Sequence, residues 1–507
     1  MNNFLDITFW QWLLYDENRP LLFTQGIFWC FFAFLWVIPW NYKNSPARIL
    51  WLLFVSLYFY YLSSGFYFIL LIFSTIVDFV IGKAIFRAPS QAQKKFFLFL
   101  SLFINLGLLA YFKYTYFFAD LWNELLETNW KPYDILAYGI SALFDLEINY
   151  EKIFLPAGIS FYTFQTLSYS IDIYRGKLTP VNSIVDFAFF VSFFPQLIAG
   201  PIVRAADFIP QIRMPHSLSE EDFGKSIYLI LTGLFKKIVI SDYLSINWVD
   251  RVFAEPVRYS AIENLLAVYG YAIQIYCDFS GYSDIAIGIA LLLGFRLNIN
   301  FNSPYQATNI TDFWRRWHIS LSSWLRDYLY ISLGGNRKGK LRTYVNLLIT
   351  MLLGGLWHGA HIRFIIWGAL HGIALACHKI WLETFPPSEK ESFLTKVVST
   401  FFTFHFVCFC WIFFRAENLQ KAFEMITQMT TSFEGDFVRL LQSSWQVFAI
   451  LLLGFVLHFI PFHWKEHAQK SVALLPDFAK ACLIVLASIL FFQFKTSEIQ
   501  PFIYFQF

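Results

Sequence analysis

One histidine stands out as a candidate catalyst because of the residues around it. His358 lies in the run Gly354-Gly-Leu-Trp357-His358-Gly359, near the end of an apolar stretch. Glycines let neighbouring groups approach closely, and an imidazole titrates near working pH, which suits a general base. Ionisable side chains at membrane depth are costly and by default indicate a functional site. We predict that His358 is a catalytic base; the alternative is a structural histidine that bonds to a neighbouring helix.

A second histidine, His318, lies in an aromatic and basic segment. Its apolar side chains recur at three- and four-residue spacing, the period of a helical stripe: Phe313, Trp317, Leu321, Trp324 and Tyr328. Such a helix could lie at the cytoplasmic interface as an anchor. Alternatively, it could form the wall of an entrance whose guanidinium groups attract an anionic donor, such as the phosphates of coenzyme A. The residues that we assign to donor binding are Arg315, Arg316, Trp317, Asn336 and Arg337.

Two carboxylates, Asp278 and Asp284, interrupt another apolar run. Their separation corresponds to about 600° of helical rotation, so they would not share a face. The Ser280-Gly281 pair between them could break the helix, and short polar side chains cap helix ends well. We favour this capping role over the alternative that both carboxylates line a cavity.

The C-terminal run Phe502-Ile-Tyr504-Phe-Gln-Phe507 is mostly apolar and aromatic. Its simplest interpretation is an anchor at the membrane interface. A terminus normally frays, however, so an apolar terminus could also be built to insert into the protein. In that case the phenol of Tyr504, within reach of a base, could accept an acyl group as a covalent intermediate.

The composition indicates a membrane protein. Of the 507 residues, 57% are hydrophobic and 14% are charged, whereas soluble proteins have about 25% charged residues. Apolar runs of membrane-spanning length recur from end to end, so we predict one polytopic, all-α membrane domain over residues 1–507. The net charge of +3 says little about partners, and we expect no nucleic acid. The six cysteines lack metal-ligand spacing, so we expect neither a metal site nor a disulfide framework.

The apolar runs and the loop charges together predict a topology. We expect spans at residues 21–40, 49–62, 65–81, 96–118, 225–240, 262–293, 395–414, 447–460 and 479–494, with a tight turn at Ser63-Ser64-Gly65. The loop between the third and fourth spans carries four basic residues and no acid, which places it in the cytoplasm. The same rule places the N-terminus and the C-terminal tail on the outer face. Residues 1–19 lack a basic n-region, so we expect no cleavable signal peptide.

Residues 155–174 and 184–199 are apolar but contain proline, glycine and polar side chains. A helix cannot continue through both Pro195 and Pro201, the second of which follows Gly200. Irregular backbone at membrane depth is tolerated only where it is buried in protein or lines a water-filled cavity. The sequence leaves open whether this part forms re-entrant or tilted elements or a kinked span.

These stretches together resemble the membrane-bound O-acyltransferases, and in particular the bacterial branch of alginate and peptidoglycan O-acetylation proteins. The motifs concerned are Phe194-Pro-x-Leu-x-x-Gly200-Pro201, Tyr276-x-Asp278-Phe-Ser-Gly281-Tyr-Ser-Asp284, Asn302-x-Pro304-Tyr, Asp312-Phe-Trp-Arg-Arg-Trp-His318, Tyr328-x-Tyr-Ile-x-Leu-Gly-Gly-Asn336-Arg and Leu356-Trp-His358-Gly. The resemblance implies a helical bundle with re-entrant or tilted helices around a central funnel or tunnel, with the core motifs in residues 194–378 and an aromatic tail at 495–507. It also implies that His358 is the intramembrane catalytic histidine and that His318 is the second signature position. Tunnel or structural roles are expected for Pro195, Gly200, Pro201, Asp278, Asp284, Trp357 and His371.

The resemblance further implies a reaction. The donor would be cytoplasmic acetyl-CoA, and the acceptor an extracytoplasmic polysaccharide, either an alginate-like exopolysaccharide or peptidoglycan, at the bacterial inner membrane. The tail resembles the Phe-x-Tyr-x-x-Phe ending of the small tyrosine-bearing partner in teichoic-acid D-alanylation, with Tyr504 as the matching tyrosine. No extracytoplasmic serine hydrolase module is recognisable, so an SGNH-type partner would complete the transfer.

Two other functions fit parts of the sequence. One is D-alanyl transfer from a carrier protein, which the fused tail and the alginate-type motifs disfavour. The other is a transporter whose intramembrane histidines relay protons, although the chain shows no inverted repeat of the kind common in transporters.

Overall fold

The molecule is built from helices. A computed structural model describes residues 13–16, 19–37, 46–145, 148–198, 200–214, 218–385, 392–494 and 502–503, and it contains no strand within these ranges. Six helical segments of this part are long and apolar enough to cross a membrane, or seven if one bent pair of helices forms a single span. The prediction of an all-α, polytopic membrane protein is therefore confirmed.

The N-terminal helices are separated by short connections. They are α1 (Gly26–Val37), α2 (Pro46–Ser64), α3 (Phe68–Arg87), α4 (Gln91–Leu126) and α5 (Ile135–Phe144). Helices α2 and α3 are separated only by the 3-10 turn Gly65–Tyr67, where Gly65 has a φ of +58°. A residue with a side chain would be strained in this left-handed conformation, which explains the glycine. The 3-10 turn lies at the predicted position, but Pro46–Arg87 counts as one apolar helical segment of 42 residues rather than as the two predicted spans.

Helices α3, α4 and α6 (Ile159–Tyr174) are joined by buried polar contacts. Asp78 of α3 is fully buried, and its carboxylate accepts hydrogen bonds from Ser101 Oγ (2.6 Å) and Asn105 Nδ2 (2.8 Å) of α4. Ser170 Oγ of α6 donates a third hydrogen bond to it, at 3.2 Å. Because a buried carboxylate is costly without hydrogen-bond partners, these contacts fix the three helices relative to one another.

The proline-containing segment is a break in the backbone. Helix α7 (Ile184–Ser192) ends before Pro195, which lies in the first turn of the short α8 (Phe194–Leu197). Gly200 lies so close to α8 that an added Cβ would be 2.4 Å from Gln196 Cα. Of the alternatives that the sequence left open, the structure has separate short elements here rather than one kinked helix. Helix α9 (Ala205–Ile212) follows.

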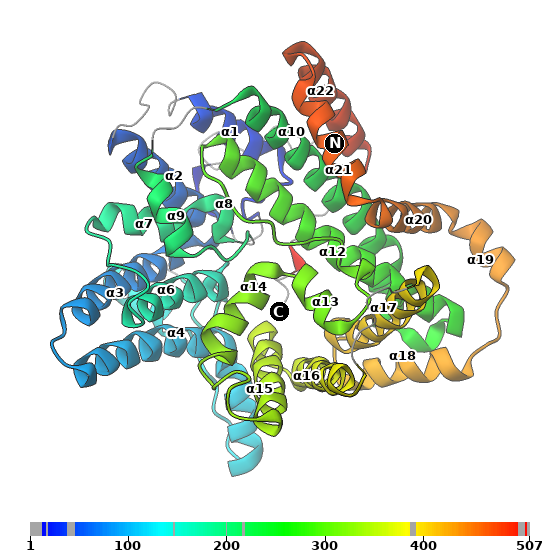
Figure 1. The fold of residues 1–507 in the computed structure, drawn as a ribbon, viewed down its shortest axis with the longest axis horizontal. Helices are drawn as coiled ribbons and strands as arrows, with labels where there is room; N and C mark the ends of the chain where they lie inside the picture. The colour runs from blue at the N-terminus through cyan, green and yellow to red at the C-terminus, as the bar shows by residue number, and fades with distance from the viewer. Residues whose placement is uncertain are drawn as a thin grey trace.

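Helix α12 (Ala261–Leu292) runs through the middle of the molecule (Figure 1). In its most apolar stretch of 18 residues, 94% of the residues are buried. It packs on α10 (Glu220–Leu234) and on the π-helical segment Phe235–Asp242. An added Cβ at Gly281 would be 2.7 Å from the carbonyl oxygen of Gly233, so this glycine permits close packing and does not break the helix. The prediction that Asp278 and Asp284 cap two half-helices is therefore wrong. The elements between α10 and α12 also include the π-helical Ser245–Val249, α11 (Asp250–Ala254) and the 3-10 turn Pro256–Arg258.

The segment predicted as one aromatic helix is divided. Its elements are the 3-10 turn Pro304–Gln306, α13 (Ile310–Arg316), α14 (Ile319–Trp324) and the π-helical Leu325–Tyr330. His318, between α13 and α14, has a φ of +40° and interrupts the helical path. The side chains of Phe313, Trp317 and Leu321 are each 1% exposed because they pack on other helices. Of the two alternatives that the sequence left open for this segment, an anchor helix at the membrane interface does not fit these buried side chains.

Helices α15 (Lys340–His358) and α16 (Ile362–Thr384) pack backbone against backbone. A Cβ at Gly355 would lie 2.2 Å from the carbonyl oxygen of Phe364, and one at Gly368 would lie 2.3 Å from that of Met351. The two helices can approach this closely only because glycine has no side chain.

Helix α17 (Phe393–Arg415) packs on α12 and α16. The helices that follow lie at the edge of the bundle, on the right and at the top of Figure 1: α18 (Leu419–Thr431), α19 (Phe437–Ser443), α20 (Trp445–Phe459), α21 (Phe462–Leu474) and α22 (Asp477–Phe494). Helices α19 and α20 meet at 88°, so the span predicted at residues 447–460 is one limb of a bent pair. Residues 502–503, red in the middle of Figure 1, lie in the interior rather than at this edge.

Candidate active site

His358 is the last residue of α15, and its side chain is buried. Gly359 is extended and ends the helix. The imidazole ring contacts the rings of Trp357, Trp367 and Phe414, with centroids 4.9, 5.1 and 5.1 Å away. The candidate base therefore lies at a helix C-terminus within an aromatic environment.

Two side chains of α4 bind the end of α15. Lys113 Nζ donates a hydrogen bond to the carbonyl oxygen of Trp357 at 2.6 Å, and the Tyr114 hydroxyl donates one to the carbonyl oxygen of Leu356, also at 2.6 Å. The last carbonyl groups of a helix have no partner within it, and its C-terminus favours positive charge. Lys113 and Tyr114 therefore stabilise the helix end that presents His358.

His318 is also buried, and its position is fixed by Asn300. The His318 Nδ1 and Asn300 Oδ1 atoms are 3.2 Å apart, and the same amide oxygen accepts hydrogen bonds from the backbone N–H and hydroxyl of Ser320. The His318 ring contacts the rings of Phe279 (4.6 Å) and Trp357 (6.3 Å). Trp357 thus contacts both candidate histidines.

His371 is fully buried on α16, as expected for a core or supporting residue. The Trp314 indole N–H donates a hydrogen bond to His371 Nδ1 at 3.3 Å. The Trp367 ring lies 4.8 Å from the His371 ring and 5.1 Å from the His358 ring. His371 is therefore separated from His358 by a tryptophan.

Asp278 and Asp284 of α12 each form an ion pair with a lysine of the π-helical segment. Asp284 Oδ2 is 2.6 Å from Lys236 Nζ, and Asp278 Oδ1 is 2.5 Å from Lys237 Nζ. Lys237 also pairs with Asp242 at 2.8 Å. Two adjacent lysines therefore engage two carboxylates that lie six residues apart on α12.

The described part of the tail lies next to Asp278. The Ile503 backbone N–H donates a hydrogen bond to Asp278 Oδ2 at 3.0 Å. Phe502 and Ile503 are 1% and 3% exposed, and the Phe502 ring contacts the rings of Phe279 and Tyr282 at 5.2 and 5.0 Å. These two residues are buried within the protein, so they do not act as an anchor at the membrane interface. Tyr504 lies outside the described residues.

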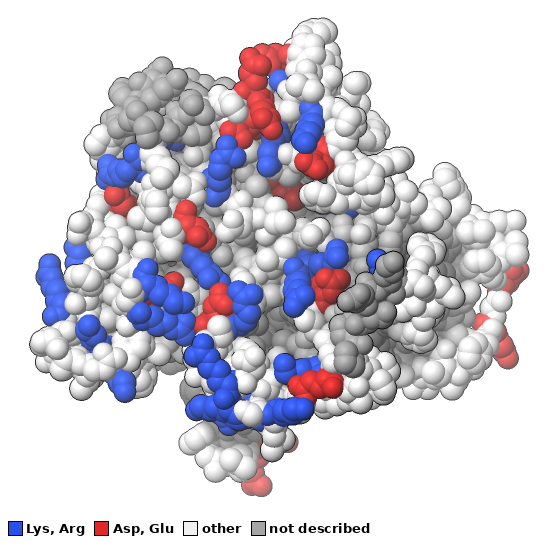
Figure 2. Space-filling model, viewed as in Figure 1, with Lys and Arg blue, Asp and Glu red and all other residues white. Residues whose placement is uncertain are grey.

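The residues predicted to bind a donor are divided between the surface and the interior. Arg315, Asn336 and Arg337 are exposed, and Arg316 pairs with Asp312 at 2.9 Å. Trp317 instead packs in the core, with its ring 5.0 Å from that of Trp411. Figure 2 shows lysine and arginine side chains gathered over the region of α13, α14 and the start of α15.

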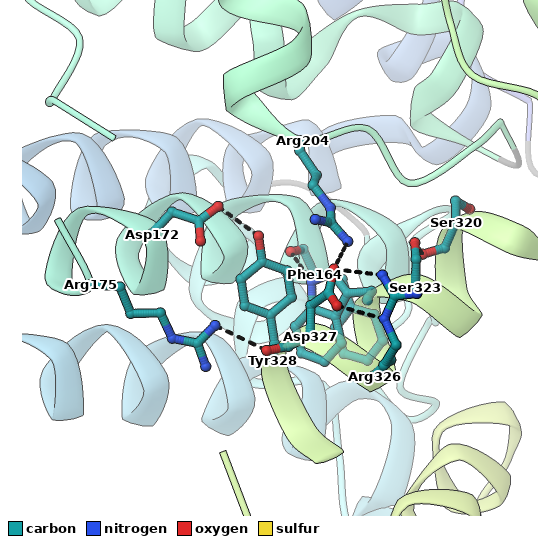
Figure 3. Close-up of polar contacts among 10 residues, drawn as sticks. Phe164, Asp172, Arg175, Arg204, Ser320, Ser323, Arg326, Asp327 and Tyr328 are labelled. Carbon is teal, nitrogen blue, oxygen red and sulfur yellow. Dashed lines mark hydrogen bonds and ion pairs between the residues drawn. The ribbon is translucent and has the colours of Figure 1, made fainter. Parts of the chain in front are cut away.

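A cluster of three arginines around Asp327 lies beside this region (Figure 3). Arg204 and Arg326 form ion pairs with its carboxylate at 2.6 and 2.7 Å, and Arg175 donates a hydrogen bond to its carbonyl oxygen at 2.9 Å. Although burial disfavours the charged form, hydrogen bonds from Arg326 and Arg204 lower the pKa of Asp327. Tyr328 donates to Asp172 at 2.6 Å. The cluster has more positive than negative charge around Asp327, and Arg326 is exposed.

Aromatic rings connect the Asp327 cluster to the histidines. Trp324, three residues before Asp327, stacks on Phe164 with a centroid separation of 3.9 Å. Phe164 stacks in turn on Trp357 at 5.4 Å. The basic cluster and the end of α15 therefore belong to one packed unit.

Comparison with known proteins identifies the family of the chain. The sequence pattern of the membrane-bound O-acyltransferase family, MBOAT, matches residues 177–416. The peptidoglycan O-acetyltransferase of Helicobacter pylori is 37% identical over 443 residues, covering 81% of this chain and 80% of that protein. The chain belongs to the membrane-bound O-acyltransferase family.

Other relatives of this membrane-bound O-acyltransferase differ in their named acceptors. The probable alginate O-acetylase AlgI of Pseudomonas aeruginosa is 41% identical over 415 residues, which are 81% of this chain and 75% of that protein. The teichoic acid D-alanyltransferase of Bacillus subtilis is more distant, at 29% identity over 268 residues, half of this chain and 66% of that protein. Family membership identifies the chain as an acyltransferase rather than a transporter.

Several residues of the candidate site were not predicted from the sequence. Lys113 is an ionisable residue inside a long apolar run, which is itself a functional signal, and that signal could have identified it. Arg175, Arg204 and Arg326 gave no such signal because they lie in three separate parts of the chain. Only the fold brings them to the same aspartate.

Proposed function

We propose that this acyltransferase transfers an acetyl group from acetyl-CoA for the O-acetylation of an extracytoplasmic polysaccharide. Two relatives are named for acetylation of peptidoglycan and of alginate, and we infer an acceptor of this class. We place it in the bacterial inner membrane, and the loop charges favour an orientation with the N-terminus and the tail on the outer face. A passage through the bundle would let the acyl group cross while coenzyme A stays in the cytoplasm.

One observation supports this proposal above the others: continuous ring contacts connect His358 with the tail. The contacts run from His358 to Trp357 (4.9 Å), from Trp357 to His318 (6.3 Å), from His318 to Phe279 (4.6 Å) and from Phe279 to Phe502 (5.2 Å). Phe502 is two residues before Tyr504 in the sequence. We therefore propose Tyr504 as the acyl acceptor.

In the proposed reaction, His358 acts as the base and Tyr504 as the first acceptor. The imidazole removes the proton from the phenol, and the phenolic oxygen attacks the carbonyl carbon of the thioester. The carbon–sulfur bond breaks, and the thiolate of coenzyme A takes the proton from the imidazolium. Burial among aromatic rings favours the uncharged imidazole that this base needs.

The roles of the remaining groups follow from this reaction. His318, held by Asn300, would support the site as a polar or binding group. An SGNH-type partner outside the membrane would move the acetyl group from Tyr504 to a hydroxyl of the polysaccharide.

The basic surface would bind the phosphates of the donor. Arg315, Arg337 and Arg326 are exposed guanidinium groups, a type that binds phosphate in bidentate geometry. We add Arg326 and its neighbours at Asp327 to the donor-binding residues predicted from the sequence.

The test is a single-turnover assay of purified protein with radiolabelled acetyl-CoA. Wild-type protein should release coenzyme A in a burst and retain label. His358→Ala should lower the burst rate about 100-fold or more, because a general base typically contributes that much. The matched control is His463→Ala, which removes an exposed imidazole from α21. A His358→Ala burst equal to that of the control would reject the proposed base.

A further inference from the structure

The tail meets α12 at a buried ion pair whose role the reaction above does not explain. Asp278 and Lys237 each have a side chain that is 3% exposed. Asp278 Oδ1 faces Lys237 Nζ at 2.5 Å, whereas Oδ2 accepts the hydrogen bond of the Ile503 N–H at 3.0 Å. The carboxylate therefore uses one oxygen for the lysine and the other for the tail.

The charges at this point favour an additional donor. Lys237 pairs with two carboxylates, those of Asp278 and Asp242, so this group holds one more negative than positive charge when all three side chains are ionised. A buried charge without sufficient partners is strongly destabilising. Hydrogen bonds from an N–H to a carboxylate are among the stronger ones in proteins. The Ile503 N–H thus supplies a donor to the Asp278 oxygen that does not face Lys237.

Neighbouring residues of α12 receive the preceding side chain of the tail. The Phe502 ring lies against Phe279, one residue after Asp278 in the sequence, and against Tyr282. Phe279 also contacts His318 at 4.6 Å. One stretch of α12 therefore binds both the backbone and an aromatic side chain of the tail, next to the candidate site.

We propose that Asp278, held in place by Lys237, is the binding site for the C-terminal tail and sets the position of Tyr504. Asp278 is then a positioning residue that acts through the tail. This inference rests on the proposed role of Tyr504 as acyl acceptor. Asp278, in the Tyr276–Asp284 motif, would then bind the tail in addition to forming its ion pair with Lys237.

The sharpest test removes the donor and leaves the ion pair intact. Ile503→Pro eliminates the backbone N–H, and the matched control Ile503→Ala keeps it. Loss of a hydrogen bond to a buried carboxylate should lower the rate of acetyl transfer about tenfold or more in Ile503→Pro relative to Ile503→Ala. The concentration of coenzyme A that gives half-maximal thermal stabilisation should stay within about twofold, because the donor site is unchanged.

A second variant and a direct measurement of the tail complete the test. Asp278→Asn keeps an acceptor oxygen but removes the charge, and it should also lower the transfer rate. In Ile503→Pro and in Asp278→Asn, carboxypeptidase should release the C-terminal residues of the purified protein about tenfold faster than in Ile503→Ala. Equal transfer rates in Ile503→Pro and Ile503→Ala, or equal protection of their tails, would overturn the inference.

The same experiments separate this inference from the proposed relay. If Tyr504→Phe transfers acetyl groups normally, the relay fails, and the carboxypeptidase assay still decides whether Asp278 binds the tail. If Tyr504→Phe is inactive while Ile503→Pro is fully active, the relay stands and the positioning role of Asp278 is wrong.

Discussion

Lys113 of α4 and Trp357 of α15 are 244 residues apart in the chain, yet Lys113 Nζ lies 2.6 Å from the Trp357 carbonyl oxygen. Trp357 immediately precedes His358, so the lysine fixes the backbone next to the candidate base. The neighbouring contact, from the Tyr114 hydroxyl to the Leu356 carbonyl oxygen, has the same length but no formal charge. This pair separates the effect of a charge from that of a hydrogen bond.

Lys113→Met should lower the acetyl-transfer rate more than Tyr114→Phe does. The methionine keeps most of the length of the side chain but removes the ionisable amine donor at the C-terminus of α15. A misplacement of a reacting group by about 1 Å can cost about 100-fold in rate, and we expect a loss approaching this size for Lys113→Met. The measurement is the first-order rate constant of acetyl transfer in the single-turnover assay, with thermal unfolding as a check on folding. Equal rate constants in the two variants would contradict a specific role for the lysine.

Tyr504→Phe should remove the label from the tail. The substitution keeps the aromatic ring and deletes only the nucleophilic oxygen, so the protein should still bind coenzyme A. After reaction with radiolabelled acetyl-CoA, the C-terminal peptide of the wild-type protein should hold acetyl label, and that of the variant should hold none. Tyr150→Phe, which removes an exposed hydroxyl, is the control. Label in the variant's peptide would show that another group accepts the acetyl.

Arg326→Ala should weaken donor binding without affecting the chemical step. We expect KM for acetyl-CoA to rise about tenfold, the usual size for one charge-assisted contact to a phosphate, with little change in kcat. A shortened thioester that lacks the phosphates of coenzyme A should react equally well with the variant and the wild type. Arg439→Ala, on the distant helix α19, is the matched control. An equal rise in KM for both donors would argue against phosphate binding by Arg326.

Gly355→Ala should destabilise the protein. The added methyl group would meet the Phe364 carbonyl oxygen at 2.2 Å, and overpacking of this kind costs about 1–3 kcal/mol. Gly107→Ala on α4 is the control, since nothing lies within 4 Å of a Cβ there. Thermal unfolding in detergent should show a lower Tm for Gly355→Ala and an unchanged or higher Tm for the control. Equal Tm values would mean that α15 and α16 can separate without cost.

The sequence was most informative where the signal was local. The glycines beside His358 predicted close approach, and Gly355 and Gly359 do lie against Phe364. The helical spacing of Phe313 and Trp317 correctly indicated a buried face, but periodicity does not say what that face packs against. The sequence left an interface anchor and an entrance wall as alternatives, and in the structure the Trp317 ring packs on Trp411. His318 interrupts the stripe in a conformation that no spacing argument could predict.

Partners distant in the chain explain most of what the sequence could not predict. Asp278 was interpreted from its immediate neighbours as a helix cap, whereas its ion-pair partner Lys237 is 41 residues away. Asp327 likewise pairs with Arg204, which is 123 residues distant. A single sequence contains no record of such pairs, because helical periodicity describes one element at a time.

The tail contact has a consequence for the order in which the protein assembles. Ile503 binds Asp278 across 225 residues of chain, so α12 is synthesised and inserted long before its partner emerges from the ribosome. Contacts of such long range form late and slowly compared with local ones. Until then, Asp278 Oδ2 and the faces of Phe279 and Tyr282 have to be covered by water, lipid or a chaperone. The nascent bundle should therefore pass through a tail-free stage that is vulnerable to membrane proteases.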